Sequence, residues 1–177
     1  AISVILLIGL MWRNYGDYSK KAGKGEIFYA AEKREDMRQG FLKAAAVTPK
    51  LKVADTVFNR EQICECIRKA SGEKAKIMVF PELCISGYTC GDLFLQERLL
   101  RSCREQLKEI AAFSKEVDAL IFVGLPVERE GKLYNAAAAL CRGEVLCMIP
   151  KAFIPSYGEF YETRYFCPGN REAVPFS

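Results

Sequence analysis

The sequence contains no histidine among its 177 residues. A Ser-His or Cys-His pair within the chain is therefore excluded as a source of acyl-transfer chemistry. If the chain takes part in such chemistry, a carboxylate, a lysine or a tyrosine must carry the proton instead. The absence of histidine directs attention to charged side chains at the ends of predicted strands.

Paired cysteines of the Cys-x-x-Cys kind that zinc sites use are also missing. The eight cysteines are scattered, and several of them lie inside apolar runs. This distribution predicts buried free thiols, no metal site and a reducing, cytoplasmic location.

The sequence has neither a basic stripe nor a long apolar run. Its 26 basic and 22 acidic residues are spread along the chain, so a nucleic-acid partner is not predicted. The apolar run at 1–12 is too short to span a bilayer and lacks the positive flank of a signal peptide. No membrane partner is predicted. The alternative is a membrane-tethered, non-catalytic module in which residues 1–12 complete an upstream membrane helix.

Residues 1–36 differ from the rest, because 13–36 are polar and charged without an apolar period, which predicts weak order. The segment is interpreted as the end of an upstream helix, a family-specific extension or a translated upstream region. The last is favoured, because codons for Arg34, Glu35 and Asp36 can form a purine-rich ribosome-binding sequence just before Met37. Met37 would then be the natural start.

Residues 37–177 alternate between strand and helix patterns, which predicts one α/β domain or part of a larger one. Apolar runs predict strands at 41–47, 76–80 and 119–126, and a hairpin at 133–141 and 145–150. Helical spacing predicts helices that begin at the N-caps Asn59 and Asp92. No helix cap or polar tail precedes Ser177, so a truncated chain is expected.

Glu82 follows the buried strand 76–80 directly after Pro81, where α/β proteins place catalytic groups. A loop with Gly87 and Tyr88 comes next, and Lys151 follows the hairpin at a second strand end. From the local sequence alone, the favoured interpretation of Glu82 is a solvated loop residue, and that of Lys151 is a surface lysine.

Several segments together resemble the carbon-nitrogen hydrolase (nitrilase) superfamily, and within it the glutaminase domain of glutamine-dependent NAD synthetases. They are FPELCISGYTCGDLF at 80–94, GLP at 124–126, LYNAAA at 133–138, IPKAFIPSYGEFYETRYF at 149–166 and AAAVTPKLKVADTVFNREQI at 44–63. The resemblance covers 37–177 and leaves 1–36 unmatched. It implies a nitrilase-like four-layer α-β-β-α sandwich, of which this chain holds a part.

The resemblance also implies roles for individual residues in glutamine hydrolysis through a thioester. Glu82 matches the general base, Lys151 the residue that stabilises the oxyanion, and Glu159 a further glutamate that positions lysine and substrate. The glutamine pocket would be lined by Tyr88, Tyr157 and Phe160.

In the family the nucleophilic cysteine lies on a later strand, which here would fall past Ser177. Neither Cys84 nor Cys167 has the matching context, so the isolated chain is expected to have no glutaminase turnover. The resemblance implies a following synthetase domain that uses ATP and Mg to amidate nicotinate adenine dinucleotide, no cofactor within these 177 residues, and a homo-oligomer. A stand-alone amidase of the same superfamily is the alternative.

Overall fold

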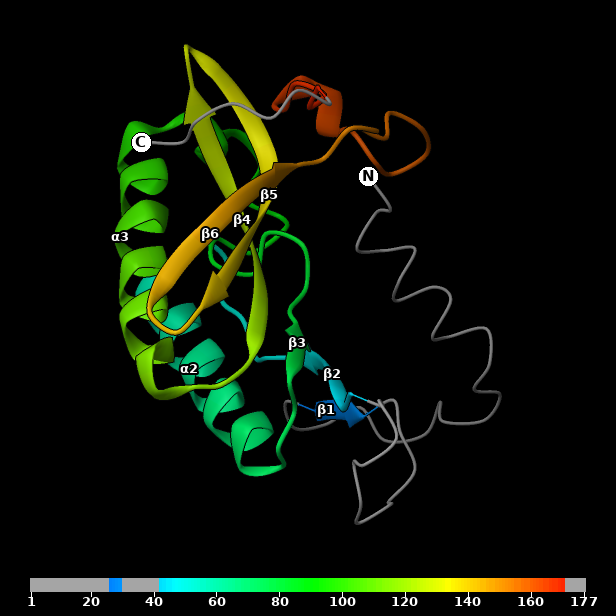
Figure 1. Ribbon diagram of the computed structural model, residues 1–177. Helices are drawn as coiled ribbons and strands as arrows, with labels where there is room; N and C mark the ends of the chain where they lie inside the picture. The colour runs from blue at the N-terminus through cyan, green and yellow to red at the C-terminus, as the bar shows by residue number, and fades with distance from the viewer. Residues whose placement is uncertain (1–25, 30–41, 171–177) are drawn as a thin grey trace.

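The computed structural model describes residues 26–29 and 42–170, which form a six-stranded sheet with helices (Figure 1). The strands lie in sequence order across the sheet. They are β1 (Glu26–Tyr29), β2 (Ala44–Thr48), β3 (Ile77–Val79), β4 (Leu120–Arg129), β5 (Lys132–Cys141) and β6 (Glu144–Pro150). The helices are α2 (Thr56–Gly72) and α3 (Glu97–Phe113), with short 3-10 helices η1 (Gly91–Leu95), η2 (Ser114–Glu116) and η3 (Glu162–Arg164).

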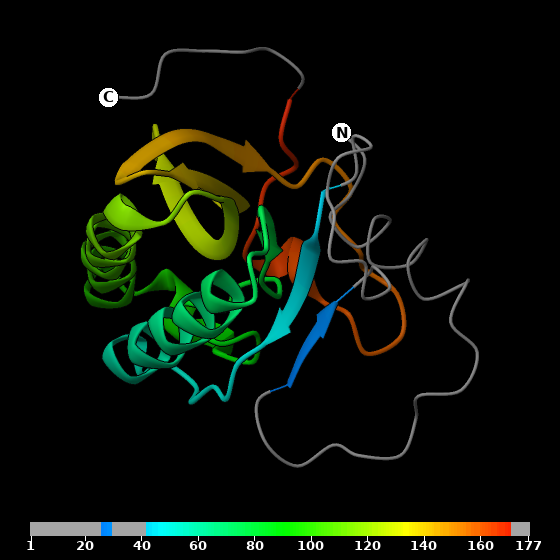
Figure 2. The same ribbon diagram turned by 60° about the horizontal axis from the view of Figure 1, so that its bottom comes forward.

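The strands β2, β3 and β4 are parallel, and the other pairings are antiparallel. Parallel neighbours need crossover connections, which α2 and α3 provide. The two helices pack together on one face of the sheet, as the two ribbon views show (Figure 1, Figure 2). The predicted α/β class is confirmed, and the described residues supply one helix layer and one sheet layer.

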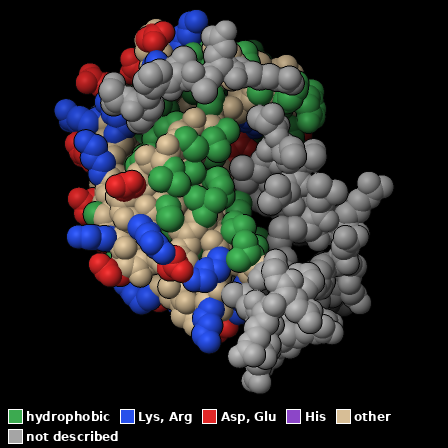
Figure 3. All heavy atoms as spheres, viewed as in Figure 1, with side chains coloured by type: hydrophobic (Ala, Val, Ile, Leu, Met, Phe, Trp, Pro, Cys, Tyr) green, Lys and Arg blue, Asp and Glu red, His purple; other side chains and the backbone are tan. Residues whose placement is uncertain are grey.

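The core lies between these layers. Ile63 and Ile67 of α2, Ile110 of α3 and Ile121 of β4 are completely buried. In the space-filling view, hydrophobic side chains gather over the sheet, whereas charged side chains lie along α3 (Figure 3). On the edge strand β6, Leu146 is 55% exposed. Among the described residues, no helix is long and apolar enough to cross a membrane.

Both predicted N-caps are wrong. Helix α2 begins one turn earlier, because Asp55 caps it by accepting a hydrogen bond from the Phe58 backbone at 3.1 Å. Asn59 is fully buried inside the helix, where its amide binds the Lys52 backbone and the Ile85 carbonyl. It therefore joins the loop before α2 to the loop that follows Glu82.

Asp92 lies in η1 rather than at the start of the long helix, which begins after Gln96. Its carboxylate accepts hydrogen bonds from the Arg164 guanidinium and the Tyr165 hydroxyl, each at 3.1 Å. Asp92 thus fastens the segment around η3 to the loop after β3, and it serves tertiary structure instead of helix capping.

The hairpin of β5 and β6 is confirmed, with a register shift between Ala139 and Leu140. At the other edge of the sheet, β1 pairs with β2 in antiparallel register. The prediction for the rest of residues 1–36, including a start at Met37, lies outside the described residues.

Gly124 in β4 allows the loop that carries Glu82 to approach the sheet. A Cβ atom at this position would lie 2.4 Å from the Leu83 backbone nitrogen and 2.8 Å from the Pro81 carbonyl oxygen. Both contacts are with backbone atoms, which cannot move aside as a flexible side chain does. The position of Glu82 therefore depends on the absence of a side chain in the neighbouring strand.

Gly124→Ala is expected to lower the free energy of unfolding by about 1–3 kcal/mol, because the added methyl group overlaps the backbone of the Glu82 loop. Urea unfolding followed by circular dichroism measures the loss. Gly72→Ala is the matched control, since a Cβ there meets no atom within 4 Å and alanine favours the helix. Equal stability of the two variants would show that the close approach imposes no constraint.

Candidate active site

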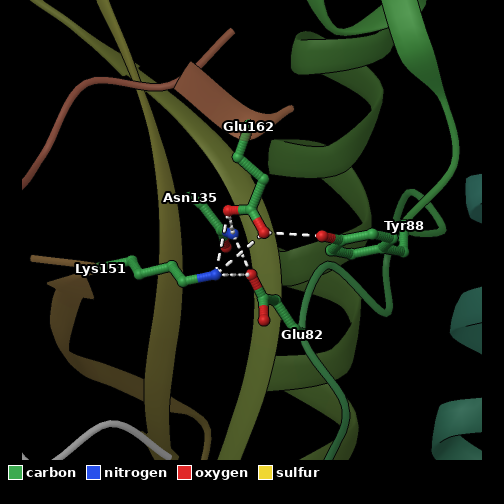
Figure 4. A network of polar contacts seen from close by, with 5 residues as sticks. All are labelled: Glu82, Tyr88, Asn135, Lys151 and Glu162. Carbon is green, nitrogen blue, oxygen red and sulfur yellow. Dashed lines mark hydrogen bonds and ion pairs between the residues drawn. The ribbon is translucent and has the colours of Figure 1, made fainter. Parts of the chain in front are cut away.

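Five polar side chains converge near the points where β3 and β6 end (Figure 4). They are Glu82 and Tyr88 from the loop after β3, Asn135 from β5, Lys151 just after β6, and Glu162 from η3. Because β3 and β5 flank β4, and β6 pairs with β5, residues distant in sequence meet at this end of the sheet. The arrangement concentrates two carboxylates, one ammonium and two neutral donors in one place.

Lys151 lies between the two carboxylates. Its Nζ atom is 2.6 Å from Glu82 Oε1 and 3.0 Å from each carboxylate oxygen of Glu162. Partial burial lowers the pKa of Lys151, but the hydrogen bonds and charges of Glu82 and Glu162 outweigh burial and raise it above its ordinary value. Lys151 is therefore a protonated, positively charged group at neutral pH.

Glu162 is the most buried of the three charged groups, with its side chain 7% exposed. Its Oε1 atom accepts a hydrogen bond from the Tyr88 hydroxyl at 2.7 Å, and Oε2 accepts one from Asn135 Nδ2 at 3.3 Å. Burial, the hydrogen bond to Glu162 and the nearby negative charges raise the pKa of Tyr88. The tyrosine consequently stays neutral and donates a hydrogen bond to Glu162.

Glu82 differs from Glu162 in how its two oxygens are used. Oε1 accepts hydrogen bonds from Lys151 and Asn135, whereas Oε2 has no hydrogen-bond partner among the described residues. Its side chain is 23% exposed. One face of the Glu82 carboxylate is thus held by donors, and the other oxygen is available to accept a proton from a reacting group.

The backbone around Glu82 is fixed by the neighbouring strand. Phe80 N donates to the Phe122 carbonyl at 2.9 Å, and Ile85 N donates to the Gly124 carbonyl at 3.1 Å. Between them Leu83 adopts a φ of 52°, in the left-handed region that a leucine rarely occupies. This sharp turn directs Glu82 away from the core while the Leu83 side chain is buried.

The structure brings Glu82, Lys151 and Tyr88 together, as their predicted shared site requires. It does not bring Glu159 to them: Glu159 is exposed and makes no hydrogen bond or ion pair with Lys151. Glu162, three residues later, occupies the position that was expected for Glu159. Glu162 is therefore the glutamate that contacts Lys151, and the positioning role of Glu159 stays a prediction. The charge of Glu159 helps to raise the pKa of Tyr88.

Tyr157 and Phe160 lie on the loop between Lys151 and η3, with their rings 5.8 Å apart in an edge-to-face arrangement. Tyr157 is 72% exposed, and neither side chain hydrogen-bonds to the five-residue cluster. Their role as lining of a glutamine pocket stays a prediction.

Two residues of the cluster, Asn135 and Glu162, were not predicted from the sequence, although LYNAAA and YGEFYETRYF contain them. The sequence alone does not show which polar residue of a motif faces inward.

All eight cysteines are free, and none is hydrogen-bonded to Glu82, Lys151 or Glu162. Cys84 is fully buried, where its thiol donates to the Gly124 carbonyl and accepts from the Gly124 N–H. Burial raises the pKa of Cys84 to about 12. These features disfavour Cys84 as a nucleophile, because the thiolate is the reactive form.

Among the described residues no group of three His, Cys, Asp or Glu side chains is arranged to hold a metal ion.

Known proteins resemble this chain in sequence and in structure. The glutamine-dependent NAD(+) synthetase of Mycobacterium tuberculosis is 34% identical over 145 residues, which are 82% of this chain and 21% of that protein. The crystal structure of the glutamine-dependent NAD(+) synthetase from Cytophaga hutchinsonii matches with a TM-score of 0.70 and 31% identity, over 75% of this chain and 22% of that one. This chain therefore spans about a fifth of the length of these relatives.

An amidase from Nesterenkonia sp. also matches, with a TM-score of 0.62 and 24% identity, over 77% of this chain and 51% of that one. At this identity the match shows a shared nitrilase-like fold. The carbon-nitrogen hydrolase family matches residues 43–176, a range that contains all five residues of the cluster. The chain belongs to the carbon-nitrogen hydrolase family.

Proposed function

We propose that this chain carries part of the glutamine-hydrolysing site of a glutamine-dependent NAD synthetase. The observation that carries the proposal is the Lys151 ammonium, held 2.6 Å from Glu82 Oε1 and 3.0 Å from Glu162 in a member of the carbon-nitrogen hydrolase family. Relatives named glutamine-dependent NAD(+) synthetase support the choice of substrate. Synthesis of NAD would belong to the complete protein. The relatives with this name are about five times as long as this chain.

In the proposed reaction Glu82 is the general base. Its free Oε2 atom accepts the proton of a cysteine thiol, and the sulfur attacks the amide carbon of glutamine. Glu82 passes this proton to the leaving nitrogen, so ammonia departs as the thioester forms, and water then releases glutamate and regenerates the thiol. The reacting thiol would come from a cysteine other than these eight, since none of them hydrogen-bonds to the five-residue cluster.

Lys151 would stabilise the oxyanion that develops on the amide oxygen. Its three N–H groups have three carboxylate oxygens within hydrogen-bond distance, so a bond to the oxyanion requires release of one contact. Glu162 is the partner that can release one, because Tyr88 and Asn135 continue to satisfy it. This exchange explains why a lysine already paired with two carboxylates remains able to serve the reaction.

The remaining assignments follow from the same proposal. Glutamine would contact Tyr88, Tyr157 and Phe160, and ammonia would pass to a synthetase domain of the same protein that uses ATP and Mg. A homo-oligomer and a cytoplasmic location stay predictions. The free state of all eight cysteines agrees with a reducing compartment.

A stand-alone amidase of the same family is the second candidate. The fold shared with the Nesterenkonia amidase, of which this chain covers 51%, supports it. The NAD synthetase relatives are more similar in sequence, at 31–34% identity against 24%. Glutamine hydrolysis coupled to NAD formation is therefore the favoured function.

Glu82→Gln and Lys151→Ala are expected to lower glutamine-dependent NAD formation by about 10²- to 10⁴-fold, because they remove the base and the positive charge. The assay uses the product of the complete reading frame that encodes this chain. NAD formation from free ammonia serves as the internal control, since it bypasses glutamine hydrolysis and reports correct folding.

Two outcomes would contradict the proposal in different ways. Glutamine-dependent activity that survives in Glu82→Gln would show that another group is the base. A wild-type protein that forms no NAD from either nitrogen source, but hydrolyses a simple amide, would favour the amidase.

Glu162→Gln is expected to lower glutamine hydrolysis by about 100-fold, because it removes one of the two charges that position Lys151. Glu159→Gln, the matched change three residues away, is expected to stay within about threefold of wild type, since Glu159 is exposed. Steady-state rates of glutamate release from the same complete protein measure both. The reverse order of effects would restore Glu159 as the residue that positions the lysine.

A further inference from the structure

We propose that Asn135 is a positioning residue of this site, which holds Glu82 and Glu162 in place and keeps the Glu82 carboxylate ready to act as a base. The inference rests on the proposed hydrolysis of glutamine. Asn135 has contacts with all three residues: its Nδ2 atom donates to Glu82 Oε1 and Glu162 Oε2, and its backbone carbonyl accepts from the backbone N–H of Lys151 at 2.8 Å.

The position of Asn135 in the sheet makes these contacts rigid. It lies in β5, where it pairs with Pro126 of β4, and its neighbour Ala136 pairs with Pro150 of β6. The residue is 3% exposed. A buried amide is costly without partners, and here two carboxylates bind its amino group. The central strand therefore fixes a donor between two carboxylates that come from separate loops.

The chemistry of the contacts assigns the orientation of the amide. If the carbonyl oxygen of Asn135 faced Glu82 and Glu162, three acceptors would meet without a proton between them. With Nδ2 in this place, each of its two N–H groups meets one carboxylate. Both protons of the amide are thus used by the two glutamates.

The site requires hydrogen-bond donors that carry no charge. Two carboxylates and one ammonium leave one negative charge, which a general base needs. An additional cation would neutralise that charge, whereas Asn135 and Tyr88 stabilise the carboxylates without removing it. The charged or titratable groups around Asn135 are Lys151 beyond β6, Glu162 in η3, and Glu82 and Tyr88 after β3.

Asn135→Asp tests the inference, because it keeps the shape of the side chain while it replaces donors by a third carboxylate. We expect kcat for glutamine hydrolysis by the complete protein to fall about 100-fold, with KM within about threefold. The acid limb of the profile of kcat/KM against pH should move upward by about one pH unit. The reason is that a like charge and the loss of a donor both disfavour ionised Glu82.

Asn59→Asp is the matched control. Asn59 is also a fully buried asparagine, but its amide binds only backbone groups. We expect this variant to lower the thermal midpoint without moving the acid limb. If Asn135→Asp lowers kcat and leaves the acid limb in the wild-type position, Asn135 is only a structural residue and the inference is overturned.

A measurement without turnover separates this inference from the proposed function. In the complete protein, side-chain carboxyl ¹³C signals of glutamate are followed through a pH titration, and Glu82→Gln and Glu162→Gln assign them. Asn135→Ser, which introduces no charge, should raise the pH at which the two signals titrate. Unchanged titration overturns the role of Asn135. A shifted titration in a protein without glutaminase activity sustains the role of Asn135 and rejects only the proposed substrate.

Discussion

The ammonium group of Lys151, shared by Glu82 and Glu162, is the interaction on which the site depends. Without it two partly buried carboxylates would face each other, and each would repel the negative charge of the other. With it, the three charged groups form one unit, although Glu82 and Lys151 are 69 residues apart in the sequence. The position of the Glu82 carboxylate, the charge of the site and the path of the loop from Lys151 to η3 are therefore coupled.

The scaffold supports this unit through contacts that have no chemical role of their own. Gly124 admits the backbone of the Glu82 loop, and Asn59 ties that loop to the segment before α2. Asp92 holds the other side through Arg164 and Tyr165. These residues come from different elements, and each restrains a segment that would otherwise be a mobile surface loop.

The features that the sequence predicted correctly are those that depend on local sequence pattern. Apolar runs predicted β4, β5 and β6, because strand burial depends on local pattern. The motifs led to Glu82 and Lys151, whose positions directly after strands restrict where their side chains can lie. The family and the α/β fold were thus accessible from the sequence.

Other features could not be read in the same way. Asn59 and Asp92 have side chains that suit a helix cap equally well, and only the tertiary structure shows that they bind other loops. Glu159 and Glu162 are close in one loop, and the choice between them depends on the turn of η3. Local sequence specifies the type of group available, whereas long-range packing decides which group of that type is used. In a site without histidine this decision is critical, because the proposed base is a carboxylate whose behaviour depends on its neighbours. One oxygen of Glu82 is held by Lys151 and Asn135, and the other has no hydrogen-bond partner among the described residues.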